Sequence, residues 1–430
     1  KCIMGLSSLV PYSRREIASH GRDTRCTDGM DMELLAPAGG FEQLQYAIRF
    51  GADAAYMACD RFGMRQRASN FALDEIPAAI DYAHAHDVKV YVTLNIVMHD
   101  DDIEMLGSYA RTLRDAGVDA FIIGDLGAAR LVREIAPEVD LHVSTQASVS
   151  NALAARAWYE LGAKRIVCAR EMSLEGIAQM RERIPDDLQL EAFVHGAMCM
   201  AYSGRCLISD YLTGRSALSG HCTQSCRWHY TLEEEKRPGE HYPIEEDEHG
   251  SYIMNAEDLN MLAHLEELEG VGIDSIKIEG RNKKAFYVAT VVNAYRNVLD
   301  GKPVADFAHE LEVVSHRPYS TGFYFGPAHQ AQATDERTQL VEWAAEVLAC
   351  DEKEPGTWSV EARCRNGFDE TTPLEALSPK MPVCPITIRG LCHVEEEPPV
   401  PVPRANRAME RYRFDCNEPL EPYTIIRMPK

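Results

Sequence analysis

The chain has 430 residues, and its 44 Lys and Arg against 67 Asp and Glu give a formal net charge of −23. Its 45% apolar and 26% charged residues exclude a disordered or collagen-like chain, and its length predicts one large domain and a smaller one. No apolar run approaches the roughly 18 residues of a membrane-spanning helix, and the excess of acid excludes a general phosphate-binding surface.

Residues 1–31 mix Gly, Ser, Arg, Asp and two cysteines without any periodicity. The segment IMGLSSLV within them is apolar over only 8 residues and is not followed by a small-residue cleavage pattern. We therefore do not interpret it as a signal peptide. We expect residues 1–31 to be an N-terminal extension and the protein to be cytoplasmic.

From Met32 the sequence alternates short apolar runs with amphipathic stretches, which is typical of βα units around a parallel sheet. The predicted strands are ELLAPA, AAYMAC, KVYVTLNI, AFIIGD, LHVSTQAS, RIVCARE, LQLEAFVHG and SIKIEG. Eight such units predict an α/β fold of the (β/α)8 TIM-like barrel type, which usually takes roughly 250 residues. A doubly wound sheet is the structural alternative, but no G-x-G-x-x-G fingerprint follows the first strand.

The connection between the seventh and eighth predicted strands, residues 197–250, is far longer than the others. Its first part is rich in Cys, Gly and Arg, and loops of this length are usually functional or disordered. From residue 335 the sequence pattern changes to short runs of alternating apolar and polar residues, separated by turns rich in Pro, Gly and acidic residues. We therefore expect a barrel domain over 32–334 with a Cys-rich insertion at 197–250, and a small all-β domain over 335–430.

The pattern Cys199-x6-Cys206-x15-Cys222-x3-Cys226 places four of the 13 cysteines within 28 residues. In an intracellular protein such a group more often binds metal than forms disulfides. Four thiolates can hold zinc, or can each ligate one iron of a [4Fe-4S] cluster. The open spacing lacks the tight C-x2-C knuckles of zinc ribbons and favours the cluster; zinc, or cysteines without a metal, are the alternatives.

Polar residues near the ends of the predicted strands are candidates for the active site, because barrel enzymes keep their active sites there. His195, Glu279 and Arg281 are the catalytic candidates, with His195 as an acid, base or donor to a metal-bound sulfur. The candidate substrate-binding residues are Arg65, Arg67, Asn95, His142, Gln146, Arg170, Tyr202, Arg227 and Trp228. Arg67 and Arg281 suit a carboxylate, and Trp228 suits stacking on a base or packing over the metal. For any one of these residues, helix capping or satisfaction of a buried carbonyl is the competing interpretation.

The segment EAFVHGAMC over 191–199, followed by SGRCLIS over 203–209, resembles the signature of the peptidase U32 family of collagenase-like proteins. The segments MELLAPAG, FGMRQRASNF, SIKIEGR and RPYSTGFYFG extend this resemblance over about residues 32–430. The domain layout is similar to that of the tRNA 5-hydroxyuridine synthases within the family.

This resemblance implies an iron-sulfur RNA-modifying enzyme that hydroxylates the wobble uridine of tRNA, with prephenate as co-substrate. Its [4Fe-4S] cluster would be held by Cys199, Cys206, Cys222 and Cys226. The partners would be tRNA, bound through a local basic patch, and the small dicarboxylate co-substrate. The family name implies a peptidase instead, although the sequence has no H-E-x-x-H or G-x-S-x-G motif. A non-catalytic iron-sulfur accessory protein is the third hypothesis.

Overall fold

A computed structural model provides the fold. The structure describes residues 29–64, 70–199, 201–228, 231–233, 241–243, 257–328, 339–395 and 398–430. The described helices include none that is both long and apolar enough to cross a membrane.

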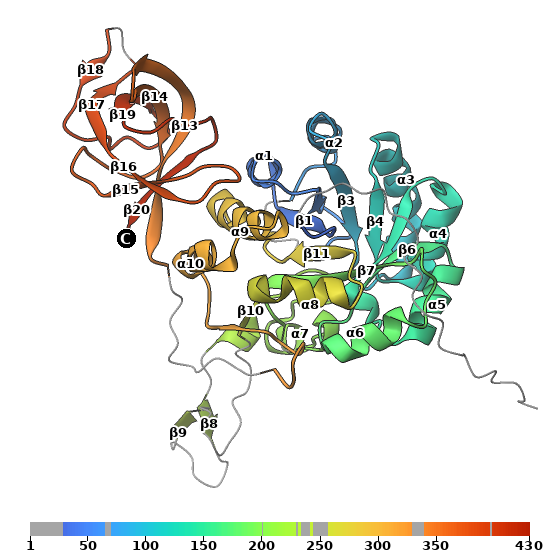
Figure 1. The fold of residues 1–430 in the computed structure, drawn as a ribbon. Coiled ribbons are helices and arrows are strands. Elements are labelled where there is room, and N and C mark those ends of the chain that lie inside the picture. The colour runs from blue at the N-terminus through green and yellow to red at the C-terminus, as the bar shows by residue number, and fades with distance from the viewer. Residues whose placement is uncertain are drawn as a thin grey trace, which may run out of the picture.

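All eight predicted strands form, and they close into a parallel barrel, as Figure 1 shows. The barrel strands are β1 (Glu33–Ala38), β2 (Ala54–Met57), β3 (Lys89–Leu94), β4 (Ala120–Ile123), β5 (Asp140–Val143), β6 (Ala163–Val167), β7 (Gln189–Ala197) and β11 (Ser275–Ile278). Closure comes from β11, which pairs in parallel with both β7 and β1. The expectation of a TIM-like α/β barrel is thus confirmed.

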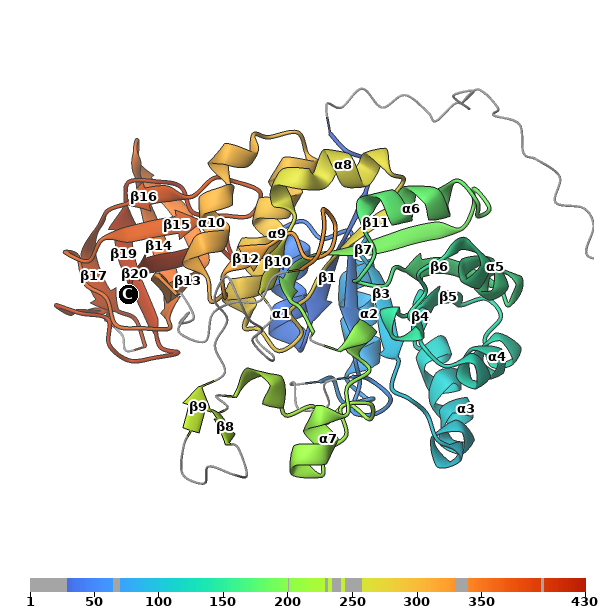
Figure 2. The same ribbon diagram turned by 90° about the horizontal axis from the view of Figure 1, so that it is seen from below.

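Helices follow the strands and cover the outside of the barrel (Figures 1 and 2). They are α1 (Phe41–Arg49), α2 (Ile76–His84), α3 (Asp100–Asp115), α4 (Leu126–Ile135), α5 (Ala152–Glu160), α6 (Leu174–Arg181), α8 (Leu265–Gly270), α9 (Ala285–Leu299) and α10 (Ala308–Val313). Short 3-10 helices lie at Thr145–Ala147, Leu262–His264 and Val304–Asp306. Nearly all of α9 is buried, as its largely apolar sequence AFYVATVVNAYRNVL requires.

The barrel interior combines a small apolar cluster with a buried ionic network. Leu35, Ala54, Tyr56, Tyr91, Ala120 and Ile122 form the apolar cluster. Arg165 Nη2 donates to Glu33 Oε2 at 3.1 Å, and Arg165 Nη1 donates to Glu191 Oε2 at 3.2 Å. The other oxygen of Glu191 accepts from Lys277 Nζ at 2.8 Å. Each of these buried charges is therefore paired, which is the condition for their tolerance inside a barrel.

The insertion begins where β7 ends and returns to the barrel before α8, so it includes β10, which lies past the predicted bound of 250. It contains α7 (Ile208–Thr213), 3-10 helices at Tyr202–Gly204 and Ser225–Arg227, and the strands β8 (Thr231–Glu233), β9 (His241–Pro243) and β10 (Asp258–Asn260). The β8–β9 hairpin stands off the barrel in both ribbon views (Figures 1 and 2). Unexpectedly, β10 pairs antiparallel with β7 and parallel with β12 (Tyr319–Ser320), so the sheet continues past the barrel rim.

The C-terminal part is a separate antiparallel sheet, as expected for an all-β domain. Its strands are β13 (Val341–Glu354), β14 (Thr357–Cys364), β15 (Leu374–Leu377), β16 (Cys384–Ile386), β17 (Ile388–His393), β18 (Val400–Pro401), β19 (Arg411–Cys416) and β20 (Ile425–Pro429). In Figure 1 it lies beside α1, α9 and α10. Val341, Leu377 and Ile425 belong to the same hydrophobic core as the barrel helices.

The outer domain boundaries fall largely outside the described residues. The predicted extension, 1–31, is described only from residue 29, where Met30 N donates to Leu299 O at 2.8 Å. The predicted boundary between 334 and 335 lies within 329–338, which is also outside the described residues. Both boundaries stay predictions.

Candidate active site

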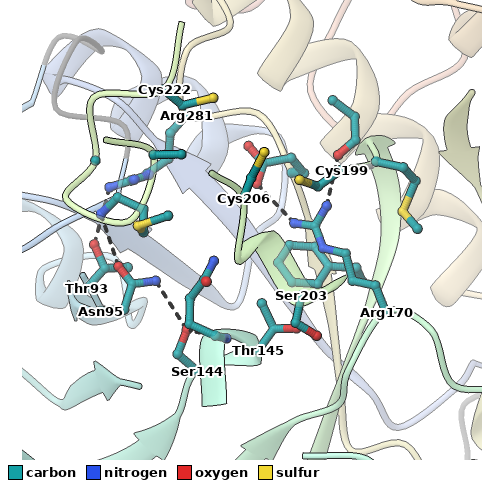
Figure 3. Close-up of a pocket in the computed structure, with 18 of the residues that line it drawn as sticks. Thr93, Asn95, Ser144, Thr145, Arg170, Cys199, Ser203, Cys206, Cys222 and Arg281 are labelled. Atoms are coloured by element: carbon teal, nitrogen blue, oxygen red, sulfur yellow. Dashed lines mark hydrogen bonds and ion pairs between the residues drawn. The ribbon is translucent and has the colours of Figure 1, made fainter. Parts of the chain in front are cut away.

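A cavity of about 360 Å³ lies at the carboxyl end of the barrel strands, under the insertion. The strand ends contribute Thr93, Asn95, Ser144, Thr145, Gln146, Arg170, Ala197, Glu279 and Arg281 to its lining, and the insertion contributes Ser203, Cys206, Ala217, Gly220, Cys222, Thr223, Gln224 and Cys226. Figure 3 shows Cys199, Cys206 and Cys222 around the same opening, with Arg170 and Arg281 on different sides of it. We call this the mouth cavity.

All four cysteines of the predicted ligand set line the mouth cavity as thiols, without a disulfide among the described residues. Cys199 and Cys222 are exposed, and Cys206 and Cys226 are partly exposed. Cys168 is different, because its burial in the barrel wall raises the pKa of its thiol to about 12. A thiol must lose its proton to bind metal, so the four mouth cysteines are the suitable donors and Cys168 is a buried apolar side chain.

The turns that carry these cysteines are tied to the barrel loops by polar contacts. Ser203 donates from both its backbone N and its Oγ to the carboxylate of Glu171, at 2.6 and 3.0 Å. Arg205 Nε donates to Gln146 O at 3.1 Å. The backbone of Ser203 is left-handed, with φ 45°, which its paired contact to Glu171 holds in place. The barrel thus fixes the position of the insertion next to Cys206.

The four thiols of the mouth cavity are donors that suit the predicted iron-sulfur cluster, whose presence stays a prediction. No three described His, Cys, Asp or Glu side chains gather closely enough to hold one metal ion. A tetrahedral zinc site requires all four sulfurs about 2.3 Å from one point. In a four-iron cluster each cysteine binds a different iron, so four thiols spread around one cavity suit it.

Cationic side chains dominate the charged lining of the mouth cavity: Arg170, Lys277 and Arg281 against a single carboxylate, Glu279. Arg170 lies over the ring of Phe193 at 3.8 Å and donates to Ala197 O at 2.9 Å. Its Nη2 also reaches Glu279 Oε2 at 3.4 Å. In a chain of net charge −23 this lining favours a small anion.

Arg281 and Asn95 are held at the mouth by hydrogen bonds to neighbouring strand ends. Arg281 Nη1 donates to Thr93 Oγ1 at 3.2 Å. Asn95 Nδ2 donates to Ser144 Oγ at 3.2 Å, and Asn95 Oδ1 accepts from Met64 N at 3.1 Å. The structure therefore brings Asn95, Gln146, Arg170, Glu279 and Arg281 together on one cavity, while their roles toward a substrate stay predictions.

His195 is not among the lining residues of the mouth cavity. It is 1% exposed and sits against Tyr295 and Tyr319, whose hydroxyls each lie 3.4 Å from a ring nitrogen. Burial, with Lys283 nearby, lowers the pKa of His195 to about 3. Its imidazole is therefore neutral, and this geometry favours a packing role over the catalytic role predicted for it.

His142 also departs from its predicted place at the mouth. It lines a different cavity with Lys89, Asp119, Asp140 and Gln189, which lie at or before the starts of their strands. Its ring packs edge-on against Tyr91, with 4.7 Å between ring centres. His142 therefore lies toward the amino end of the barrel, away from the four cysteines.

The remaining candidates lie at the edge of the described structure or beyond it. Tyr202 and Trp228 are each 50% exposed on the insertion and are not part of the mouth lining. Arg65, Arg67 and the side chain of Arg227 lie outside the described residues. Lys277 lines the cavity but was not among the predicted residues, although the period of two along SIKIEG places it on the same side as Glu279, which directly follows β11.

Comparisons with known proteins agree with this architecture. The model of Peptidase family U32 matches residues 39–334. The chain is 34% identical over 409 residues to tRNA hydroxylation protein P1 of Bacillus subtilis, covering 93% of this chain and 95% of that one. It is 37% identical over 335 residues to tRNA hydroxylation protein P of Escherichia coli, covering 68% and 74%. It is also 33% identical over 314 residues to a protein named Collagenase from Porphyromonas gingivalis, covering 69% and 74%. The chain belongs to peptidase family U32.

Proposed function

We propose that this protein is an RNA-modifying enzyme that hydroxylates the wobble uridine of tRNA to 5-hydroxyuridine, using a [4Fe-4S] cluster and prephenate. The observation that carries the proposal is the gathering of four thiols around a cation-lined cavity at the barrel mouth. Two relatives that match 68% or more of the chain are named tRNA hydroxylation proteins, which supports RNA hydroxylation as the reaction class.

Cys199, Cys206, Cys222 and Cys226 would hold the cluster. Hydroxylation of a pyrimidine carbon is chemistry that protein side chains do poorly, and a bound cluster would supply redox or Lewis-acid chemistry. The chain's own contribution is to place these thiols at the opening of the barrel and to anchor the turn before Cys206 through Glu171.

The cationic lining would bind the carboxylates of prephenate. The guanidinium groups of Arg170 and Arg281 offer the planar, two-pronged geometry that a carboxylate accepts best. Lys277, whose ammonium group is paired with Glu191, lies in the cavity wall at 4.4 Å from the centre of the Tyr56 ring. A dicarboxylate can therefore be gripped at more than one point.

A uridine can reach this cavity only from an unpaired segment of RNA, since a stacked and paired base does not enter a pocket without being turned out. The wobble position lies in such a segment, the anticodon loop. Tyr202 and Trp228, half exposed on the insertion, are candidates for stacking on a turned-out base. Enzyme, tRNA and prephenate would meet in the cytoplasm.

A peptidase is the second candidate function, because one relative is named Collagenase. The hydroxyl of Ser203 in the mouth cavity donates to the carboxylate of Glu171, and the described residues that line the cavity include no His. The described lining residues therefore contain no Ser-His pair that could act as nucleophile and base. Cleavage of denatured collagen by pure protein without iron would favour the peptidase.

The test is anaerobic purification of wild type, Cys222→Ser and Cys392→Ser, the last being a partly exposed control in β17. We expect about four irons and four sulfides per chain in wild type and in the control, and loss of both in Cys222→Ser. Incubation with unmodified tRNA and prephenate should yield 5-hydroxyuridine only with the cluster-containing proteins. One zinc without sulfide, or no product from fully loaded protein, would contradict the proposal, and the latter would favour the accessory-protein hypothesis.

A further inference from the structure

A second cavity, of about 1010 Å³, lies between the barrel and the C-terminal sheet. The barrel contributes the loop after β11, the first turn of α9 and residues 314–317. The C-terminal domain contributes Trp343 of β13 together with Arg365, Asn366 and Met409. We call this the interdomain groove. Its volume lies at the upper end of the roughly 300–1,000 Å³ of ordinary small-molecule pockets.

The interdomain groove adjoins the mouth cavity, because four residues line both: Ala197, Gln224, Glu279 and Asn282. Ala197 is the last residue of β7, Glu279 and Asn282 follow β11, and Gln224 lies in the insertion. A flexible polymer that lies in the groove can therefore place one of its monomers in the mouth cavity while the rest stays in contact with the protein surface.

The groove is far less acidic than the rest of the chain. Its lining holds Lys283, Lys284, Arg317 and Arg365 against Glu42, Asp258, Glu279 and Glu342, whereas the whole chain has 67 acids and 44 bases. Glu42 is paired with Arg365, one of these four cations, and Glu279 is paired with Arg170, which lies outside the groove. The groove can therefore accept a polyanion that the rest of the surface repels.

Lys284 is the most informative of these cations. Its side chain is exposed and forms no hydrogen bond or ion pair with any residue that the structure describes, although its backbone carbonyl accepts from Val288 N. It occupies the position before the first turn of α9, where the positive end of the helix dipole disfavours a cation. Helix stability therefore does not explain a lysine here, whereas a negatively charged ligand in the groove does.

The groove also offers surfaces on which bases stack. The guanidinium of Arg365 lies 4.4 Å from the ring centre of Trp343, and Lys283 Nζ lies 4.5 Å from that of Tyr287. Met409 is 56% exposed at the groove, and its backbone has φ 70°, a strained conformation for a residue with a side chain. Cations beside aromatic and apolar surfaces are the combination that binds single-stranded nucleic acid.

We propose that the interdomain groove binds the unpaired RNA segment that adjoins the target base. Phosphates of that segment lie against Lys283 and Lys284, and a flanking base packs on Met409 and the Arg365 guanidinium. The C-terminal domain is then half of the RNA site. This inference rests on the proposed function, in that an RNA base enters the mouth cavity.

The experiment measures binding of an anticodon stem-loop RNA to cluster-containing protein over a series of salt concentrations. Lys284→Glu should weaken binding about tenfold and lower the slope of log K against log salt by about 1. Met409→Gly should weaken binding about fivefold while keeping the fold intact, because glycine relieves the positive φ. Lys164→Glu makes the same charge change on an exposed lysine near the start of β6, at the opposite end of the barrel, and should bind like wild type.

Wild-type affinity in both Lys284→Glu and Met409→Gly would overturn the inference and leave the proposed function standing. Competition by polyglutamate as effective as by an RNA of equal charge would also overturn it, because the groove would then recognise charge alone. Weakened RNA binding in both variants, with no 5-hydroxyuridine formed by wild type, would support the groove and contradict the proposed function.

Discussion

Arg165 shows how a charged side chain can belong to the core of this barrel. Its side chain is 4% exposed, and it connects the carboxylates of Glu33 and Glu191 from different strands. Burial raises the pKa of Glu33, but the nearby guanidinium outweighs it and holds that pKa below its usual value. The network also orients Lys277 through Glu191, so it couples barrel stability to a cation of the mouth cavity.

Arg165→Met should therefore lower the free energy of unfolding by about 3 kcal/mol or more, because it leaves two buried carboxylates short of a partner. Chemical denaturation at neutral pH measures the change. Arg130→Met is the matched control. Arg130 pairs with Glu134 on an exposed face of α4, so its replacement should change the free energy of unfolding very little. Equal stability of the two variants would show that the network does not stabilise the barrel.

His195 predicts a pH dependence of stability. Its pKa is about 3 in the folded protein and about 6.5 in the unfolded chain, so only the unfolded chain takes up a proton between these values. The free energy of unfolding should therefore fall as pH is lowered from about 6.5 toward 3, by up to about 1.4 kcal/mol per pH unit from this group. His195→Gln should show a shallower fall than either wild type or His309→Gln, an exposed control. An unchanged slope would contradict a neutral, buried His195.

At the scale of elements, the end of β7 carries the insertion and supports the loop after β11. Gly196 pairs with Leu259 of β10 and has φ 98°. A Cβ at this position would clash with the carbonyl oxygen of Glu279. Only glycine lets the backbone leading to Cys199 pass this close to the loop that carries Glu279 and Arg281.

Gly196→Ala should cost about 3 kcal/mol or more of stability, because backbone strain of about 1–3 kcal/mol adds to this clash. It should also reduce hydroxylation and cluster content, since it displaces the start of the insertion. Gly214→Ala has a similar positive φ, 66°, but its Cβ would meet no atom within 4 Å, so only the strain remains. If both variants lose the same stability and activity, the contact between β7 and the Glu279 loop is unimportant.

The barrel strands are predictable because each is a short apolar run between helical patterns, whereas β10 is not. The sequence of β10, DLN, has one apolar residue, and its pairing with β7 spans the whole insertion.

The unexpected position of His142 has another cause. Alternation predicts which side of a strand faces inward, but strand tilt and stagger decide how high in the barrel a residue lies. His195 follows a register shift between β7 and β11, and such a bulge turns the next side chain away from the expected face.

The site residues likewise differ in whether a local sequence pattern predicts them. The four cysteines were recognisable from their spacing, because a ligand set is a local pattern, and the structure places all four on one cavity. Trp343, Arg365 and Met409 of the interdomain groove carry no such pattern. They come from separate strands and turns of the second domain, and only the packing of that domain on α1 and α9 brings them beside Lys284.

At the scale of the whole molecule, one buried ion pair joins the two domains. Both terminal nitrogens of Arg427, in β20, donate to the carboxylate of Glu310 in α10, and its Nε donates to Glu375 at 2.9 Å. The side chains of Arg427 and Glu310 are 3% and 9% exposed. Two-pronged buried contacts of this kind fix orientation as well as distance. The pair therefore fixes how β20 of the C-terminal sheet sits against α10 of the barrel.

Glu310→Ala should leave Arg427 buried with only part of its charge compensated, which costs about 3 kcal/mol and loosens the C-terminal domain from the barrel. We expect thermal unfolding to begin at a lower temperature and the affinity for the anticodon stem-loop RNA to fall several-fold. Binding of the small dicarboxylate should not change, because every residue that lines the mouth cavity belongs to the barrel or its insertion. Lys353→Ala removes an ion pair with Asp415, exposed and entirely within the C-terminal sheet, and should leave all three measurements unchanged. A Glu310→Ala protein that binds RNA like wild type despite the lower unfolding temperature would mean that RNA recognition does not depend on how the two domains are joined.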